Sequence, residues 1–512
     1  MRQSVRIMLN SGAMLGQQLL TMALQVFLLA FVLRQVSDEA YAIFLLATSL
    51  QMVLFMLRDA VTKGAMQRVA GLIETGEHDG VNRVVSSAMG IMALPAVLAT
   101  VALFAGGGHI ADFFGVRADL RETMRWTLGL TAVTAAIMLP LAPYNAIVFA
   151  HQRYDVFAAS RLGTRVLRAV IIVLLFVLVR ADVIFVMLAT VAGEVIAQVV
   201  LVVAAYRLQP ALRVRLHQVD RATLKGIVGF GSFLVCAQLA AMGGMESVKW
   251  YVGKVLSIET VTHVTIAIYL YSVFKRVVQP MTVVLVPVAS KYKAANDRRT
   301  LGVMFSRGSR YSAMLGLAAA CMVLPIAGPL LGLWLKPEMA WIGPFAATVA
   351  VVGALSLPSS CAAQMLNGIG DAKRPFWITS ASAVVTLGGT ALAIALGLGY
   401  TGAIIGICAG RVTLAVGFAW VALRAFPLRV GRFLWTAYGQ PIIAAGVASA
   451  VGLLLADRLQ PATWLPLMLT AGVTGLTYVA SFVPFVSQTE RSLLRSATRK
   501  GLAAVGIGRG QA

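Results

Sequence analysis

Apolar runs of about twenty residues alternate with short polar connections along almost the whole chain. A helix needs about 20 apolar residues to cross a hydrocarbon layer of about 30 Å. The pattern therefore predicts an all-α polytopic membrane protein with about fourteen transmembrane helices. They cover residues 11–33, 40–57, 84–107, 126–150, 166–179, 183–205, 227–250, 261–289, 311–335, 341–365, 376–398, 400–423, 438–456 and 463–486.

Positive charge is distributed unevenly between alternate connections. If residue 1 lies in the cytoplasm, most of the 43 Lys and Arg residues fall in cytoplasmic segments and few in exported ones. By the positive-inside rule, this bias predicts that both termini are cytoplasmic. The first apolar run follows Arg2 and Arg6 and is too long for the core of a cleaved signal peptide, so we expect it to remain as a helix.

The two halves of the chain have related patterns. We predict a six-helix lobe (1–206), a basic linker (207–226), a second six-helix lobe (227–426), an extra helix hairpin (427–487) and a basic tail (488–512). At an offset of 222 residues, polar residues coincide: Asn145 with Asn367, Ser160 with Ser382 and Thr164 with Thr386. An even number of helices per half makes the lobes a parallel pseudo-repeat, as in many transporters. Chance similarity between apolar helices is the alternative.

Composition excludes several classes of function. With 59% hydrophobic and 12% charged residues, little chain remains for a water-soluble catalytic domain. The net charge of +23 sits mostly in predicted cytoplasmic loops, where it sets topology and attracts anionic lipid headgroups. The four cysteines form no CxxC pair, and the sequence has no P-loop and no His/Cys set with metal-ligand spacing. We expect no cofactor, no metal and no enzymatic activity.

Two adjacent cations lie at the middle of one apolar run. Lys275 and Arg276 occupy the centre of the run 261–289, where each costs about 2.5–3.5 kcal/mol on insertion scales. They therefore need a wet cavity or a counter-charge, and one hypothesis is a cationic wall for an anionic substrate. The alternative is a displaced helix end from which both side chains reach the interface.

Other polar side chains gather in the first, second and seventh predicted helices. Gln18 and Gln25 share a face of the first helix, and Arg34 closes it. Arg58 and Asp59 are predicted to end the second helix.

Carboxylates in the sixth and seventh predicted helices have two interpretations each. Glu246 and Lys249 lie one turn apart in the seventh helix, either as an ion pair or as substrate contacts. Glu194 in the sixth helix is a candidate proton carrier, or else the partner of an arginine such as Arg168 or Arg411.

Several short motifs resemble the polysaccharide flippase branch of the MOP (multidrug/oligosaccharidyl-lipid/polysaccharide) exporter superfamily, which is related to MATE exporters and MurJ. The resemblance covers about residues 8–430. It rests on QMLNGIGDAKRPF at 364–376 and GYTGA at 399–403, on NAIVFAHQRY at 145–154, on KWYVG at 249–253, and on Pro287 with Ser290.

The resemblance implies a Wzx-like flippase of the bacterial inner membrane that feeds O-antigen or exopolysaccharide assembly. Its substrate would be an undecaprenyl-pyrophosphate-linked oligosaccharide, held in a central cationic cavity that opens to each membrane face in turn. Membrane lipids, a coupling proton or sodium ion, a polysaccharide polymerase and a chain-length regulator are the implied partners. The residues carried over for substrate binding are Arg34, Arg58, Lys249, Lys275, Arg276, Gln18 and Gln25, and the ion-coupling candidates are Asp59, Glu194 and Glu246.

Two other functions stay open at this stage. A cation-coupled multidrug exporter of the same superfamily would need carboxylates free to bind cationic drugs. A membrane-embedded polymerase or glycosyltransferase would need a large exported loop or a catalytic Asp/His cluster, and the sequence shows neither.

Overall fold

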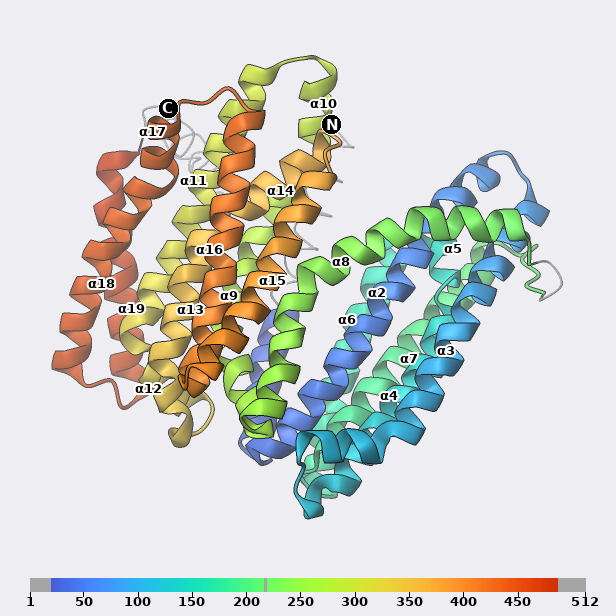
Figure 1. Ribbon diagram of the computed structural model, residues 1–512, viewed down its shortest axis with the longest axis horizontal. Coiled ribbons are helices and arrows are strands. Elements are labelled where there is room, and N and C mark those ends of the chain that lie inside the picture. The colour runs from blue at the N-terminus through green and yellow to red at the C-terminus, as the bar shows by residue number, and fades with distance from the viewer. Residues whose placement is uncertain (1–19, 216–218, 487–512) are drawn as a thin grey trace, which may run out of the picture. The chain divides into compact units, whose positions relative to one another are not determined.

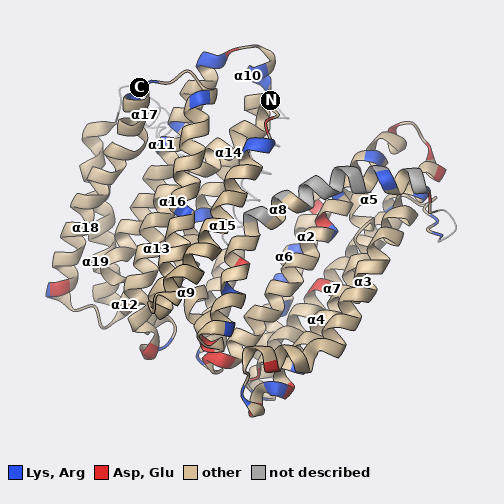
Figure 2. Cartoon of the chain, in the orientation of Figure 1, with Lys and Arg blue, Asp and Glu red and all other residues tan. Residues whose placement is uncertain are grey.

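The computed structural model describes residues 20–215 and 219–486, and over this range the chain forms helices and turns without a β-strand (Figure 1). Eleven of the described helices are long and apolar enough to cross a membrane. The all-α polytopic fold is therefore confirmed. Figure 2 shows that the helices are mostly uncharged and that Lys and Arg concentrate in the turns that connect them.

The first half begins with the shorter apolar helix Leu20–Leu33. Five long helices follow, together with the 3₁₀ turn η1 and the short helix α5, which comes between α4 and α6. Their bounds are α2 Asp38–Glu74, α3 His78–Phe114, η1 Ala118–Leu120, α4 Arg121–Leu141, α5 Tyr144–Ala150, α6 Tyr154–Leu178 and α7 Val183–Leu208.

The second half follows a similar order, with the additional short elements α10, η3 and α12, and then adds a helix pair. Its elements are α8 Arg221–Val255, α9 Ile258–Val283, α10 Leu285–Ala294, α11 Arg298–Val323, η3 Leu324–Ile326, α12 Ala327–Trp334, η4 Pro337–Ile342, α13 Gly343–Ser356, α14 Pro358–Gly368, α15 Lys373–Ala395 and α16 Gly399–Ala425. The added part comprises α17 Val430–Leu434, the π-helical turn η5 Trp435–Gly439, α18 Gln440–Leu459, α19 Trp464–Phe482 and η6 Val483–Phe485.

Two helices are longer than their apolar runs, and this corrects the predicted positions of charged residues. The second helix was expected to end at Arg58 and Asp59, but α2 continues to Glu74, so both residues lie in its interior. The run 166–179 was expected to mark a whole helix, but α6 begins at Tyr154. Hydrophobicity marks where a helix is immersed in lipid, whereas the helix itself continues through amphipathic residues that pack on protein.

Prolines interrupt the long helices of the second half. Pro280 lies inside α9, which ends three residues later, and Pro287 lies in the first turn of α10. Pro325 lies in the 3₁₀ turn that follows α11, and Pro358 begins α14. Proline cannot donate the intrahelical bond and clashes with the preceding turn, so the helix stops or bends at each site.

The pseudo-repeat is visible in one turn conformation that follows both α5 and α14. After α5, the amides of Gln152 and Arg153 donate to the carbonyl groups of residues 149 and 148; after α14, the amides of Gly370 and Asp371 donate to those of residues 367 and 366. Gln152 and Gly370 both have positive φ, 55° and 81°. The two turns are 218 residues apart, so the predicted offset of 222 differs by about one helical turn at this place.

The described chain divides into two compact units. The first holds residues up to Tyr269 together with Trp334–Ile342 and Phe376–Thr413. The second holds Leu270–Leu333, Gly343–Pro375 and the segment from Leu414 onward. The predicted lobe, linker and hairpin boundaries stay a prediction, and the predicted basic tail lies outside the described residues.

A continuous core in the first unit fixes the helices that carry the candidate site. Buried residues of α2, α3, α4, α5 and α7 pack together, among them Met92, Leu139 and Ile147. Gly64 of α2 lies so close to Ile227 of α8 that an added Cβ would be 3.2 Å from the Ile227 carbonyl oxygen. The core therefore holds α2 against both the first-half helices and the start of α8.

The described part of the connection between α7 and α8 is bonded to α3 at three backbone amides. The side chain of Asn82 accepts from the amide of Arg213 (2.9 Å), and the hydroxyls of Ser86 and Ser87 accept from the amides of Arg215 (3.1 Å) and Asp220 (3.0 Å). Asp220 in turn caps α8 by accepting from the amide of Thr223 at 2.7 Å. The predicted linker is thus an ordered strap in its described part.

Candidate anion-binding site

Arg58 is a buried cation within α2, with 5% of its surface exposed. Its Nε and Nη2 donate to Oδ1 of the adjacent Asp59 at 3.0 and 2.9 Å, and its guanidinium carbon lies 4.2 Å from the ring centre of Phe55. Its Nη1 is buried and has no hydrogen-bond partner. A buried donor without an acceptor costs about 1–3 kcal/mol, so this nitrogen indicates a place for an oxygen ligand.

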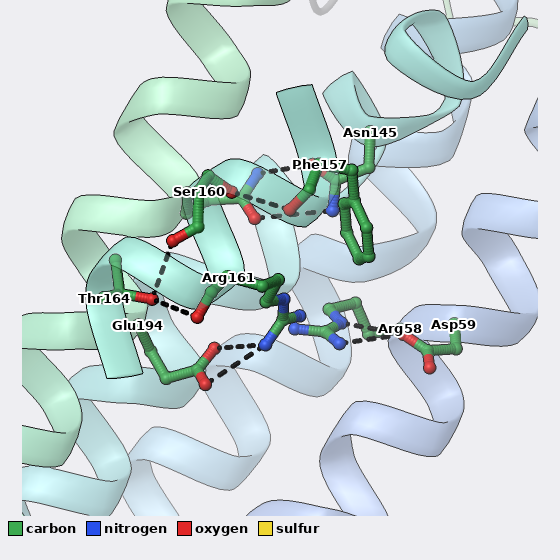
Figure 3. Close-up of polar contacts among 9 residues, drawn as sticks. Arg58, Asp59, Asn145, Phe157, Ser160, Arg161, Thr164 and Glu194 are labelled. Carbon is green, nitrogen blue, oxygen red and sulfur yellow. Dashed lines mark hydrogen bonds and ion pairs between the residues drawn. The ribbon is translucent and has the colours of Figure 1, made fainter. Parts of the chain in front are cut away.

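Arg161 of α6 faces Arg58 and pairs with Glu194 of α7. Its Nη1 donates to both carboxylate oxygens of Glu194, at 3.2 and 3.1 Å, with side-chain exposures of 21% and 25%. Figure 3 shows the guanidinium groups of Arg58 and Arg161 pointing toward one another from α2 and α6. Like charges repel, so an anion between the two groups would stabilise the arrangement.

Two more arginines follow Arg161 on the same face of α6. Arg161, Arg165 and Arg168 are spaced by four and three residues, which places them on one side of a helix. Arg165 donates from Nη1 to Thr21 Oγ1 at 3.0 Å, and the buried Nε of Arg168 has no hydrogen-bond partner. We call Arg58, Arg161, Arg165 and Arg168 the arginine cluster.

A neutral polar frame holds α5 and α7 beside this cluster. Gln198 of α7 donates to the Leu141 carbonyl oxygen at 2.7 Å and to Asn145 Oδ1 at 3.2 Å. Asn145 donates back to Gln198 Oε1 at 3.4 Å, and Figure 3 shows Asn145 in the same region as Arg161. Asn145, which coincides with Asn367 in the predicted pseudo-repeat, therefore forms a hydrogen-bonded pair with Gln198.

Glu246 and Lys249 neutralise each other on α8. The Lys249 ammonium lies 3.0 Å from each Glu246 oxygen, and the Ser49 hydroxyl of α2 donates to Glu246 Oε2. Trp250 completes the group by donating from Nε1 to Ser49 Oγ at 3.2 Å. The ion-pair interpretation of these two residues therefore describes the structure, and substrate contact by either of them stays a prediction.

A third polar group lies where helix Leu20–Leu33 turns into α2, and it includes Arg34. Arg34 is exposed and donates from Nε to the Leu335 carbonyl oxygen at 2.9 Å. Lys336 contacts Asp38 Oδ1 at 3.0 Å, and His263 Nε2 lies 3.2 Å from the other oxygen of Asp38. Arg34 is thus at the edge of a hydrogen-bonded network that ties together segments far apart in sequence.

The remaining predicted substrate contacts are dispersed. Lys275 and Arg276 lie inside α9, which excludes a helix end at that point, with Lys275 exposed and Arg276 half-buried. Gln25 is half-buried in helix Leu20–Leu33, whereas Gln18 lies outside the described residues.

Arg161 and Arg165 are members of the cluster that sequence analysis missed. Both were placed in a loop because the apolar run begins only at residue 166. The signal was present in their spacing with Arg168, since charged residues four and three apart indicate a helix face. Glu194 pairs with Arg161, and neither of the arginines first considered as its partner, Arg168 and Arg411, donates to it in the described contacts.

The arginine cluster has the chemistry of a phosphate site. The cluster has four guanidinium groups, and two of them are paired with the carboxylates of Asp59 and Glu194, so positive charge is in excess. Guanidinium groups bind phosphate oxygens through charge-assisted, often bidentate hydrogen bonds that strengthen in a low dielectric. Within residues 20–215 and 219–486, no group of three or more His, Cys, Asp or Glu is placed to hold a metal ion.

Comparison with known proteins gives a family and a fold. Residues 72–338, just over half of the chain, match the family model described as "Polysaccharide biosynthesis protein". The chain is 21% identical to the membrane protein EpsK of Bacillus subtilis (strain 168) over 340 residues, which cover 66% of this chain and 67% of EpsK.

Two solved structures are similar along most of their length. A multidrug resistance MATE family transporter of the MOP superfamily is 18% identical with a TM-score of 0.68, covering 78% of this chain and 94% of the transporter. The lipid II flippase MurJ is 14% identical with a TM-score of 0.67, covering 95% of this chain and 100% of MurJ. At these identities the similarity establishes the fold, which is the one that the sequence motifs predict.

Proposed function

Because the chain belongs to the polysaccharide biosynthesis protein family and has the fold of MOP-superfamily transporters, we propose that it is a flippase for lipid-linked oligosaccharides. Its substrate would be an undecaprenyl-pyrophosphate-linked repeat unit, moved across the bacterial inner membrane by alternating access for O-antigen or exopolysaccharide assembly. In this proposal the protein moves the lipid and catalyses no covalent reaction.

The observation that carries the proposal is the pair of facing guanidinium groups of Arg58 and Arg161, with the buried Nη1 of Arg58 unpartnered. A pyrophosphate offers several oxygens and more than one negative charge, so it can satisfy both groups at once. Arg165 and Arg168 continue the same positive face along α6. We propose further that Arg34, Gln25, Lys249, Lys275 and Arg276 contribute to the path of the substrate.

The carboxylates favour this function over cation-coupled drug export. Asp59, Glu194 and Glu246 each contact a basic side chain, at 2.9, 3.1 and 3.0 Å. A carboxylate that neutralises a neighbouring cation is less suited to bind a cationic drug. Proton or sodium coupling through one of the three is part of the proposal.

A binding measurement tests the site directly. Purified protein in detergent is titrated with undecaprenyl pyrophosphate, and Arg58→Gln is compared with Arg68→Gln, an exposed position on the same helix. Loss of charge-assisted bonds worth about 1.5–3 kcal/mol predicts roughly 10- to 100-fold weaker binding for Arg58→Gln. Unchanged affinity in Arg58→Gln, or the same loss in Arg68→Gln, would exclude the arginine cluster as the pyrophosphate site.

A deletion strain tests the transport itself. Without the protein, undecaprenyl-linked repeat units should accumulate on the inner leaflet and surface glycan should fall. Complementation with wild-type protein should reverse both effects, whereas Arg58→Gln should not. Normal surface glycan with no accumulated lipid-linked units would show that the protein moves something else.

A further inference from the structure

A basic cavity lies in the second compact unit, in a part of the molecule that the proposed transport does not use. Its volume is about 440 Å³, and it lies between α11 and the segment that connects α16 to η5. Of the described residues that line it, four are arginines and none is acidic. The lining consists of Val303, Ser306, Arg307, Arg310, Pro427, Leu428, Arg429, Arg432, Phe433 and Thr436, and we call it the basic pocket.

An aromatic floor fixes the two walls of the basic pocket. Phe305 of α11 is buried and stacks on Phe433 of α17, with ring centres 5.0 Å apart and planes at 17°. Phe305 also contacts Phe426 at 5.4 Å. Gly302 allows the connecting segment to approach α11, because an added Cβ would lie 3.4 Å from the Leu428 side chain. The arginines thus extend from a packed framework.

Arg310 is held in place at the inner end of the basic pocket. Its Nη2 donates to the Phe485 carbonyl oxygen at 2.6 Å, and its guanidinium carbon lies 5.4 Å from the Phe482 ring centre. Arg307, Arg429 and Arg432 are exposed at the mouth. The positive-inside rule requires positive charges in such a loop, but it does not require them to converge on one walled cavity.

The basic pocket lies beside the first residues of two candidate membrane spans, where a lipid headgroup is expected. Two candidate membrane spans, Arg298–Trp334 and Val430–Leu459, begin beside it. Apolar side chains next to the arginines are exposed: Val303 by 43%, Leu434 by 46% and Trp435 by 50%. A tryptophan at the start of a span is typical of the membrane interface. A positive pocket bordered by exposed apolar surface suits a molecule with a charged head and acyl chains.

We propose that the basic pocket binds the phosphodiester headgroup of an anionic membrane phospholipid, with the acyl chains along the exposed apolar side chains. Basic pockets between transmembrane helices on the cytoplasmic side are suited to such headgroups. The planar guanidinium group of arginine can donate two parallel hydrogen bonds to phosphate oxygens, and the hydroxyl of Ser306 adds a donor beside the arginines. The apolar border favours a lipid over a free phosphate ion.

The test is lipid binding by the purified full chain, measured by native mass spectrometry and by the rise in melting temperature during titration. Phosphatidylglycerol, phosphatidylcholine and inorganic phosphate are the three probes. The variant Arg429→Gln/Arg432→Gln is compared with Arg298→Gln/Arg299→Gln, which removes the same charge from the exposed start of α11 outside the pocket.

We expect phosphatidylglycerol to bind the wild-type chain, and phosphatidylcholine and inorganic phosphate to leave its melting temperature unchanged. At roughly 1 kcal/mol for each arginine, the pocket variant should bind phosphatidylglycerol about thirtyfold more weakly. The control variant should bind it like the wild type. Equal losses in both variants, equal binding of the two lipids, or the same stabilisation by inorganic phosphate would overturn the proposal.

A second variant covers the case in which the glutamine pair does not fold. Arg429→Lys/Arg432→Lys keeps the charge, and with it the membrane topology, but removes the planar fork. We expect it to bind phosphatidylglycerol more weakly than the wild type, and full affinity would contradict the proposal. The result is independent of transport, because the proposed pyrophosphate site lies in other helices.

Discussion

An arginine inside a membrane protein is stable only with partners for its five donors, and the arginine cluster shows how unevenly this need is met. Arg161 has a carboxylate and Arg165 a hydroxyl, whereas Arg58 and Arg168 each keep a buried nitrogen without an acceptor. Arg161 and Arg165 thus link α6 to α7 and to helix Leu20–Leu33. The buried nitrogens of Arg58 and Arg168 are the donors for which we expect a ligand to supply the acceptor, and in the proposed site the same ligand also contacts Arg161.

The Arg161–Glu194 pair should therefore stabilise the protein. Glu194→Gln or Arg161→Gln alone leaves a half-buried charge without its partner, so each should lower the free energy of unfolding by about 1–3 kcal/mol. The double variant should lose less than the sum, because neither charge is then left alone. Melting curves of the four proteins in one detergent measure the coupling. Additive losses would show that the two side chains do not interact.

Asp297 gives a pH-dependent contribution at the start of α11. Its carboxylate accepts from the Thr300 amide at 2.9 Å and from the Thr300 hydroxyl at 2.6 Å, and these bonds hold the pKa of Asp297 below its ordinary value of about 3.9. A lowered folded-state pKa means that the stabilisation is complete above the ordinary value and is lost as pH falls through the folded pKa.

The matching experiment compares melting temperatures at neutral and acid pH. Asp297→Ala should melt below the wild type at neutral pH, and the difference should shrink in acid. Asp297→Asn can still cap the helix and does not titrate, so its difference from Asp297→Ala should persist in acid. If the difference in melting temperature between the wild type and Asp297→Ala did not change with pH, the Asp297 carboxyl would not cap the helix in its ionised form.

At the scale of single elements, small residues allow neighbouring helices to pack closely. In α16, Gly402, Gly406 and Gly410 recur every four residues, a spacing that lets a neighbouring helix approach closely. A Cβ on Gly406 would overlap the Thr390 backbone nitrogen of α15, and Ser382 of α15 donates to the Gly410 carbonyl oxygen at 2.8 Å. The two backbones are thus in contact.

Alanine substitutions separate packing from helix propensity. Gly406→Ala should destabilise the protein although alanine is the better helix former, because the new methyl group overlaps the α15 backbone. Gly388 of α15 has no atom within 4 Å of an added Cβ, so Gly388→Ala should be neutral or should stabilise by up to about 1 kcal/mol. Equal melting temperatures for the two variants would show that the contact between α15 and α16 is loose.

Sequence reasoning was most successful for elements and least so for the residues at their ends. The pattern of apolar runs identified the spans. It misplaced the end of α2 and the start of α6, because residues 58–74 and 154–165 are amphipathic rather than apolar. Arg58 was chosen as a candidate, but its burial and its unpartnered nitrogen depend on side chains from helices far apart in sequence.

At the scale of the whole molecule, the distribution of charge predicts how the chain is inserted. The turn before α11 is flanked by Lys291, Lys293, Arg298 and Arg299, whereas beside the turn after α3 Arg117 pairs with Asp119 and Arg121 pairs with Asp112. Net positive charge in the first turn and neutralised charge in the second place them on opposite sides of the membrane by the positive-inside rule.

Cysteine labelling tests this orientation. In a background without the four native cysteines, Ala118→Cys and Ala295→Cys introduce single thiols at two exposed positions. A membrane-impermeant maleimide should label Ala118→Cys on intact cells, and Ala295→Cys only after permeabilisation. The reverse result would place the termini outside the cytoplasm and would contradict the predicted topology.

The strap between α7 and α8 has a practical consequence for anyone who wishes to attach a reporter to this protein. Its length and basic composition suggest an ideal insertion point, but its amides are bonded to Asn82, Ser86 and Ser87 of α3. A fluorescent domain placed there would detach the strap from α3 and disturb the start of α8. The exposed turn at residues 295–296, which makes bonds only to its own neighbours in the described contacts, is the better place for an insertion.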